Sequence, residues 1–146
     1  MKRKHLFQMC LMFAIVLILA SCQNNEGQTK YKVIVANPII MTHDMTDAGM
    51  DMAISGTLTY QEENQCMYIT EETDGNTLLA IWPKGTVPMM DNNQYGVNVK
   101  GIGPILEGEA IELGGGGIDQ TEIESAGYPE ECMAEVDQVV LINSEA

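Results

Sequence analysis

Short segments in which apolar and polar residues alternate, separated by turn residues, constrain the fold of this 146-residue chain more than any other feature. In residues 52–60, apolar and small polar side chains alternate, so an extended strand there has one apolar and one polar face. Gly56 occupies a core-facing position of this run, where a barrel strand can bend sharply. Sustained helical periodicity is absent from the sequence, and only residues 121–126 are expected to form a turn or two of helix.

Further short β-type runs follow, with turn residues between them. Asp74-Gly75-Asn76 is a strong hairpin signal. The predicted strands are residues 31–35, 52–60, 66–70, 77–82, 97–99, 109–113 and 136–142. Several short strands at short intervals predict an all-β fold. We expect a small OB-like barrel of five or six strands, with a β-sandwich as the alternative.

The order of several motifs resembles a loose group of small secreted bacterial domains, many of them lipoproteins. The motifs are GTLTY (56–60), CMYI (66–69), LLAIWPKG (78–85), GVNVKG (96–101), ELGGGG (112–117) and a final Cys132 before a terminal apolar strand. The resemblance covers about residues 56–143. It implies a compact β-barrel with a disulfide, and it implies no activity and no catalytic residue.

The first 22 residues have the pattern of an export signal. Lys2, Arg3 and Lys4 are followed by an apolar run, residues 9–20, which is shorter than the roughly 20 residues that a membrane-spanning helix needs. The run ends in Leu19-Ala20-Ser21-Cys22, which resembles the lipobox of bacterial lipoprotein signals. In that family the Cys thiol receives diacylglycerol before cleavage, and the new amino terminus is often acylated with a fatty acid such as palmitate. The alternative is an ordinary signal peptide in which Cys22 is incidental.

The lipobox predicts three parts of the chain and their location. Residues 1–21 are expected to be a signal peptide, residues 22–30 a lipidated flexible tether, and residues 31–146 a single β-rich domain. Cys22 would anchor this domain to the extracytoplasmic face of a bacterial cell-envelope membrane, inner or outer. The predicted contact with the membrane is therefore through the N-terminal lipid.

The predicted mature chain is strongly acidic. Removal of residues 1–21 leaves four Lys against 21 Asp and Glu, a formal charge of 4 − 21 = −17. Such a surface repels phosphates, so we expect no nucleic-acid partner. It favours a cationic partner or a metal ion, and the expected partner is an envelope protein or another cationic molecule. The alternative is a solvated acidic coat without a specific partner.

The number of cysteines left in the predicted mature chain predicts one disulfide. Cys10 leaves with the signal and Cys22 is lipidated, so Cys66 and Cys132 remain in an oxidising compartment. Closing a loop of this length would stabilise the fold by about 4 kcal/mol in the chain-entropy model. A metal pair and two free thiols are the alternatives. The disulfide is favoured because neither Cys has a CxxC or His neighbour.

Residues 41–52 contain the candidate metal ligands. Met41, His43 and Met45 resemble the Met- and His-rich tracts of extracytoplasmic copper proteins, and a flexible loop would let these three ligands converge. The alternative is that the methionines pack in the core and that His43 is an exposed loop residue. Residues 114–117 are four consecutive glycines, for which we expect a turn or bulge after the strand at 109–113.

Two functions are compatible with these observations. The first is a lipid-anchored extracytoplasmic binding or interaction module without a cofactor, and the second is a copper-binding lipoprotein that uses Met41, His43 and Met45. We do not expect an enzyme, because the predicted mature chain has a single His and its two remaining Cys are expected to be oxidised.

Overall fold

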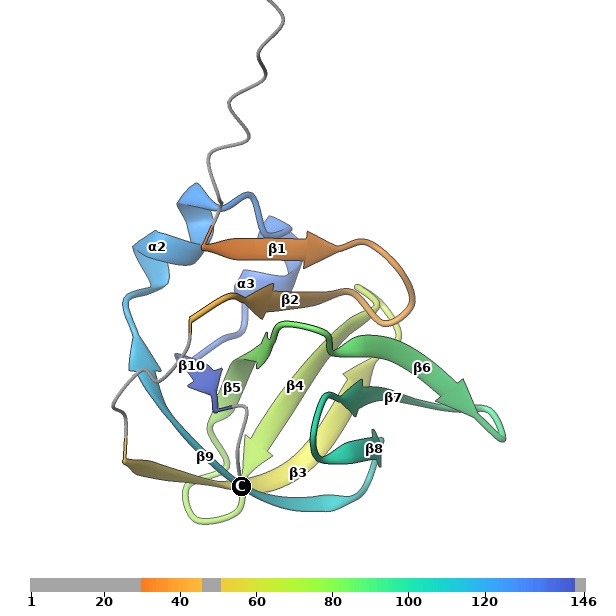
Figure 1. Ribbon diagram of the computed structural model, residues 1–146. Coiled ribbons are helices and arrows are strands. Elements are labelled where there is room, and N and C mark those ends of the chain that lie inside the picture. The colour runs from red at the N-terminus through yellow and green to blue at the C-terminus, as the bar shows by residue number, and fades with distance from the viewer. Residues whose placement is uncertain (1–29, 46–50, 144–146) are drawn as a thin grey trace, which may run out of the picture.

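The computed structural model describes residues 30–45 and 51–143. The predicted all-β fold is confirmed, with strands connected by short turns and two short helices (Figure 1). The strands of the described part are β1 (Tyr31–Ile34), β2 (Ile40–His43), β3 (Met52–Gln61), β4 (Cys66–Glu71), β5 (Thr77–Pro83), β6 (Val87–Asp91), β7 (Gln94–Val99), β8 (Gly103–Leu106), β9 (Ala110–Ile118) and β10 (Gln138–Ile142). The helices are α2 (Gln120–Ser125) and α3 (Glu130–Met133).

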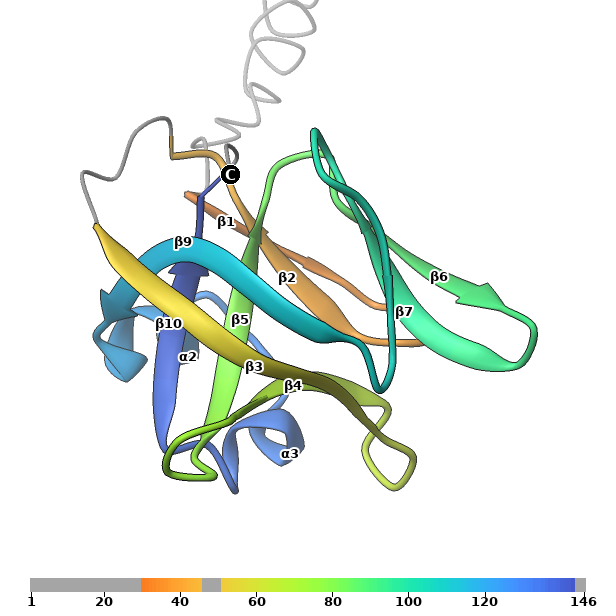
Figure 2. The same cartoon turned by 90° about the horizontal axis from the view of Figure 1, so that it is seen from below.

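Five strands close into a barrel. β3 pairs with β4 on one edge and with β9 on the other, and β9 pairs with β10. β10 lies parallel to β5, and the first residues of β5 pair with the end of β4, which completes the ring (Figure 2). The predicted bend at Gly56 falls where β3 is paired with both neighbours, opposite Glu71 and Ile111. The arrangement is a small OB-like barrel.

The β1–β2 hairpin extends the sheet beside the barrel. β2 runs parallel to the second half of β5, with Met41 opposite Ile81, whereas the first half of β5 pairs with β4. Strand order in this sheet is β1-β2-β5-β10-β9-β3-β4. The prediction of a loop at residues 41–43 is therefore wrong, because these residues belong to β2, which is buried along its whole length.

The sheet separates two apolar cores. Strand β5 is buried on both faces, as is typical of a strand that has packed side chains on each face of its sheet. Its even-numbered residues point into the barrel, where Trp82 is fully buried. The barrel core contains Ile40, Ile54, Leu58, Met67, Ile69, Leu78, Ala80, Trp82, Ile111, Leu113, Val140 and Ile142. The odd-numbered residues of β5 point outward into a second core that the helices cover.

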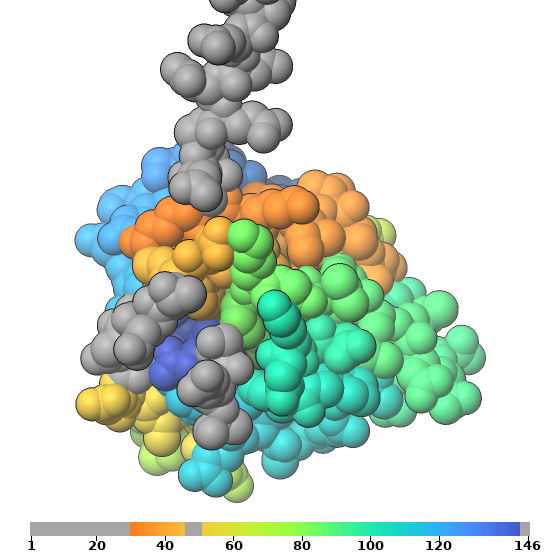
Figure 3. All heavy atoms as spheres, viewed as in Figure 1, coloured from red at the N-terminus to blue at the C-terminus, as the bar shows by residue number. Residues whose placement is uncertain are grey.

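A three-stranded sheet of order β6-β7-β8 packs against the barrel. Val97, Val99 and Ile105 of this sheet belong to the barrel core. The β6–β7 turn is Asn92-Asn93, and both residues have the positive φ that a two-residue hairpin requires. This hairpin protrudes from the body of the molecule (Figure 3).

The glycine run contradicts the prediction of a turn or bulge at residues 114–117. These residues lie inside β9, a strongly curved strand that pairs with β3 and β10 (Figure 2). A Cβ on Gly115 would collide with the carbonyl oxygen of Leu141 and lie 2.5 Å from Cδ1 of Ile54. Glycine is needed here because β9 and β10 approach each other closely at this position.

Candidate interaction surfaces

The outer face of β4 and β5, which binds ligands in many OB-folds, is covered in this protein. Tyr68, Leu79 and Ile81 on that face pack against the segment that contains α2 and α3. Ile123 of α2 and Met133 of α3 belong to the same core. A ligand cannot reach this face without displacement of the helical segment, so the exposed surfaces elsewhere are the candidates.

The predicted pair of Cys66 and Cys132 forms a disulfide in the structure. Cys66 begins β4 and Cys132 lies in α3, with Cα atoms 5.7 Å apart. Two hydrogen bonds lie beside the bridge: the Tyr68 hydroxyl donates to the Cys132 carbonyl at 3.1 Å, and Asn64 Nδ2 donates to the Glu131 carbonyl at 3.1 Å. The bridge therefore fastens the helical segment to the barrel.

Tyr128 connects the same segment to Ile39, the residue before β2. Its hydroxyl donates to the Ile39 carbonyl at 3.3 Å, and burial raises the pKa of the hydroxyl far above its usual value. Glu122 of α2 accepts hydrogen bonds from Lys30 and Tyr31, both at 2.9 Å, and these bonds lower the pKa of its carboxyl. The helical segment is thus tied to the β1–β2 hairpin through Glu122 of α2 and through Tyr128 between the two helices.

The predicted copper ligands occupy structural positions. His43 is buried, and its Nε2 lies 2.8 Å from the Ile142 carbonyl oxygen, where it donates a proton. Its Nδ1 accepts from the Met45 backbone N–H at 3.3 Å. Met41 is fully buried in the outer core, and Met45 packs against that core. Copper binding through His43 would have to break one of its two hydrogen bonds, because both ring nitrogens are in use.

The copper hypothesis stays a prediction, since residues 46–50 of the segment lie outside the described part of the chain. Within residues 30–45 and 51–143, no group of three or more His, Cys, Asp or Glu side chains is arranged to hold a metal ion.

A shallow depression of about 480 Å³ lies at the start of β3. It is lined by Asp51, Met52, Ala53, Glu112, Leu113, Gly114 and Asn143. Two carboxylates give its rim a negative charge, and its open shape leaves a bound molecule largely in water. The depression lacks the enclosed apolar lining of most small-molecule sites.

The protruding β6–β7 hairpin has an apolar and aromatic surface where it meets the barrel. Met90 is 59 % exposed and stands opposite Tyr95 across the strand pair. The Tyr95 ring packs on the Tyr60 ring with centroids 4.1 Å apart, and the Tyr60 hydroxyl donates to Oδ1 of Asn37 at 2.7 Å. We call Tyr60, Met90 and Tyr95 the hairpin patch.

The surroundings of the hairpin patch are acidic. Glu62 follows Tyr60 by two residues, and the Glu107 N–H donates to the Tyr95 carbonyl at 2.7 Å. Burial raises the pKa of the Tyr60 hydroxyl, and the hydrogen bond to Asn37 opposes this effect. At the outer edge of the small sheet, Pro88 of β6 has no N–H to offer to an added strand. A partner of the hairpin patch would therefore be recognised through side chains more than through strand addition.

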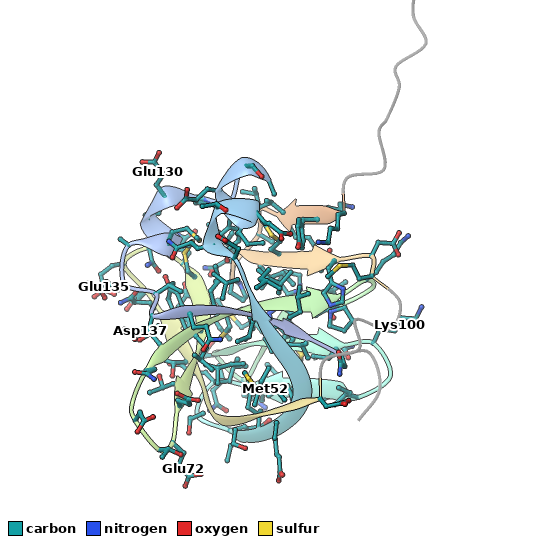
Figure 4. The ribbon with its side chains drawn as sticks, turned by 90° about the vertical axis from the view of Figure 1, so that its left-hand side faces the viewer. Met52, Glu72, Lys100, Glu130, Glu135 and Asp137 are labelled. Carbon is teal, nitrogen blue, oxygen red and sulfur yellow. A yellow bond between two sulfur atoms is a disulfide. The ribbon has the colours of Figure 1, made fainter. Side chains whose placement is uncertain are left out.

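Charge is divided between two ends of the barrel. The lysine end is defined by Lys30, Lys32, Lys84 and Lys100, and the acidic end by Glu62, Glu63, Glu71, Glu72, Asp74, Glu130, Glu131, Glu135 and Asp137. Strands β5 and β10 both run from the acidic end, at Thr77 and Gln138, to the lysine end. Figure 4 shows Lys100 on one side of the molecule and Glu72, Glu130, Glu135 and Asp137 on the opposite side.

Several predicted features lie outside the described residues. These are the signal segment, the lipidation site Cys22 and the tether up to residue 29. The described part contains no helix with the length and apolar character needed to cross a bilayer. Sequence patterns did not indicate the hairpin patch or the two charged ends, because each is assembled from segments that are distant in the chain.

Comparison with known proteins gives no match to this chain among protein-family models, curated proteins or solved structures.

Proposed function

We propose that this chain is a lipid-anchored interaction module on the extracytoplasmic face of a bacterial cell envelope. The observation that carries the proposal is the lipobox Leu19-Ala20-Ser21-Cys22, whose Cys22 stands eight positions before Lys30, the first described residue of the domain. A covalent anchor directly before a compact domain is the organisation expected of a protein that works at a membrane surface.

Binding, without catalysis, is the activity that the domain supports best. Its one described histidine uses both ring nitrogens in hydrogen bonds to backbone groups, and its two described cysteines are joined. A Ser–His or Cys–His catalytic pair would need one of these groups to be available.

The hairpin patch is the proposed contact surface, and a basic envelope protein is the proposed partner. Tyr60, Tyr95 and Met90 supply aromatic and thioether surface of the kind that is enriched in interfaces. The neighbouring Glu62 and Glu107 favour a partner with Lys or Arg side chains, and an Arg could also stack on a tyrosine ring.

The anchor is tested by Cys22→Ser. We expect an alkyne-bearing palmitate analogue, fed to cells, to label the wild-type protein and to leave the variant unlabelled and outside the membrane fraction. Cys10→Ser is the matched control, because Cys10 lies inside the signal segment and is expected to keep full labelling. Equal labelling of wild type and Cys22→Ser would refute the lipid anchor.

The contact surface is tested by Met90→Arg. This exposed substitution places a positive charge on the hairpin patch, so it should repel a basic partner while the fold is preserved. We expect cross-linking in intact cells to yield a discrete adduct with the wild type and several-fold less with Met90→Arg. Met52→Arg, at another partly exposed methionine, should leave the adduct unchanged. Equal adduct yields from Met90→Arg and wild type would exclude this surface.

A further inference from the structure

The four lysines of the predicted mature chain gather at the end of the molecule where the described domain begins. Lys30 is the first described residue, and its carbonyl accepts from the Asp44 N–H at 3.1 Å. The Lys84 N–H donates to the His43 carbonyl at 2.9 Å, so Lys30 and Lys84 flank the end of β2. The Lys100 side chain lies over Gly85, where an added Cβ would come within 2.8 Å of its Cδ.

These lysines remain available to a charged surface. All four are exposed. Lys30 pairs with Glu122 and Lys84 with Asp44, but both pairs are solvent-exposed and hold their partners weakly. Among the described residues, Lys32 and Lys100 have no ion-pair partner. Asp51 at the start of β3 and Glu112 of β9 also lie near this end. With Glu122 and Asp44 they bring four carboxylates to the four lysines, so the lysine end is close to neutral whereas the acidic end carries nine negative charges.

The opposite end of the barrel contains only acidic charge in its turns and in α3. The Gln61 side chain donates to Glu135 at 3.3 Å, and Asp137 accepts from the Thr77 N–H at 2.7 Å. These contacts bring the β3–β4 turn, the β4–β5 turn and the α3 segment to one end. The nine carboxylates of the acidic end face no lysine among the described residues, so the domain has a strong charge asymmetry along β5.

We propose that an anionic phospholipid surface contacts the lysine end and that the tethered barrel stands with its acidic end away from the bilayer. The proposal rests on the lipid anchor. Eight residue steps hold Lys30 within about 29 Å of Cys22, even for a fully extended chain. An anionic leaflet attracts each nearby lysine, and each attraction raises the population of the orientation with the lysine end at the bilayer roughly fivefold. The same leaflet repels the acidic end.

The total charge shows that the lysines would orient a protein already held by its lipid and would not bind it to the membrane without the lipid. Because the predicted mature chain carries −17, a protein without its lipid should not bind anionic vesicles. The lipid supplies the attachment, and the uneven charge selects which end lies against the headgroups. The surface that the orientation leaves exposed includes the acidic end and the protruding hairpin.

The test uses the full lipidated protein in vesicles of phosphatidylcholine, with or without phosphatidylglycerol. Lysines are acylated with a water-soluble reagent, and each site is quantified by mass spectrometry. Lys32, Lys84 and Lys100 should react roughly fivefold more slowly when phosphatidylglycerol is present, and about 1 M salt should remove the difference. Carbodiimide labelling of Glu72 and Glu130 should be equal in both vesicles. Equal lysine rates in both vesicles, or protection of these glutamates, would overturn the orientation.

Matched variants check that charge is the cause. In K32Q/K100Q, Lys84 should lose most of its protection, whereas K32R/K100R should retain it. Loss of protection in both variants would contradict the electrostatic explanation. Flotation of the same samples separates the two proposals: a protein that does not float overturns the anchor, whereas a floating protein with unprotected lysines overturns the orientation alone.

Discussion

Loss of the disulfide between Cys66 and Cys132 should lower the free energy of unfolding by about 4 kcal/mol. The two cysteines are 66 residues apart in sequence, so the bridge removes much of the conformational freedom of the unfolded chain. In a domain of this size the loss corresponds to a decrease in melting temperature on the order of 15 °C. The bridge also holds α3 against β4, so the helical segment over the outer core should loosen first.

Thermal unfolding with and without a reductant measures the effect. The double variant Cys66→Ala/Cys132→Ala is the control, since it should melt at the temperature of the reduced wild type and should not respond to reductant. A wild-type protein that melts at the same temperature with and without reductant, or that has two alkylatable thiols before reduction, would show that the bridge is absent in solution.

Gly115→Ala should destabilise the barrel by about 3 kcal/mol or more. A Cβ at this position collides with the Leu141 carbonyl oxygen and crowds Ile54 inside the barrel. The obstacle on the β10 side is backbone, which cannot rotate away as a side chain can. β9 and β10 would have to separate, and hydrogen bonds between these two strands would be lost.

Gly114→Ala provides a control one residue away. Its added Cβ meets only the Asn143 side chain, at 3.2 Å, and that side chain can shift. We expect the free energy of unfolding to change by no more than about 1 kcal/mol. The unfolded chain loses the conformational freedom of a glycine, and this gain in stability offsets the small cost of moving the Asn143 side chain. Urea unfolding of both variants gives the comparison. Similar stability of the two variants would show that β9 and β10 are not closely packed at Gly115.

Strands with a clear pattern of side chains could be predicted from the sequence. Alternation identified β3, and the strand predicted at residues 77–82 corresponds to β5. The Asp74-Gly75-Asn76 turn between β4 and β5 was also predicted, and Gly75 has the positive φ that the turn requires. In each case the local sequence is sufficient, because the strand period or the turn conformation is determined by adjacent residues.

Other elements depend on distant partners. The run from Gly114 to Gly117 has no side chains and therefore no periodicity, and its strand form follows from pairing with β3 and β10. Met41 and His43 suggested ligands in a loop, whereas pairing with β1 and β5 makes them a buried strand. β6 and β8 contain Pro88 and Pro104, which weaken a strand pattern although prolines are accepted on edge strands.

The candidate surfaces were even less predictable. The acidic end combines residues 62–63, 71–74 and 130–137, and the hairpin patch joins Tyr60 of β3 to β6 and β7. Composition predicted a negative surface, but it contains no information on where the charges gather. The tertiary fold alone places nine carboxylates at the end opposite the four lysines.

The central claim is that Cys22 is the lipidated first residue of the mature protein. The most direct measurement is the mass of the N-terminal peptide of protein extracted from bacterial membranes. We expect a peptide that begins at Cys22 and carries diacylglycerol on its thiol, with or without an added acyl chain on its amino group. A mature protein that begins at any other residue, or at Cys22 with an unmodified thiol, would contradict the proposed anchoring.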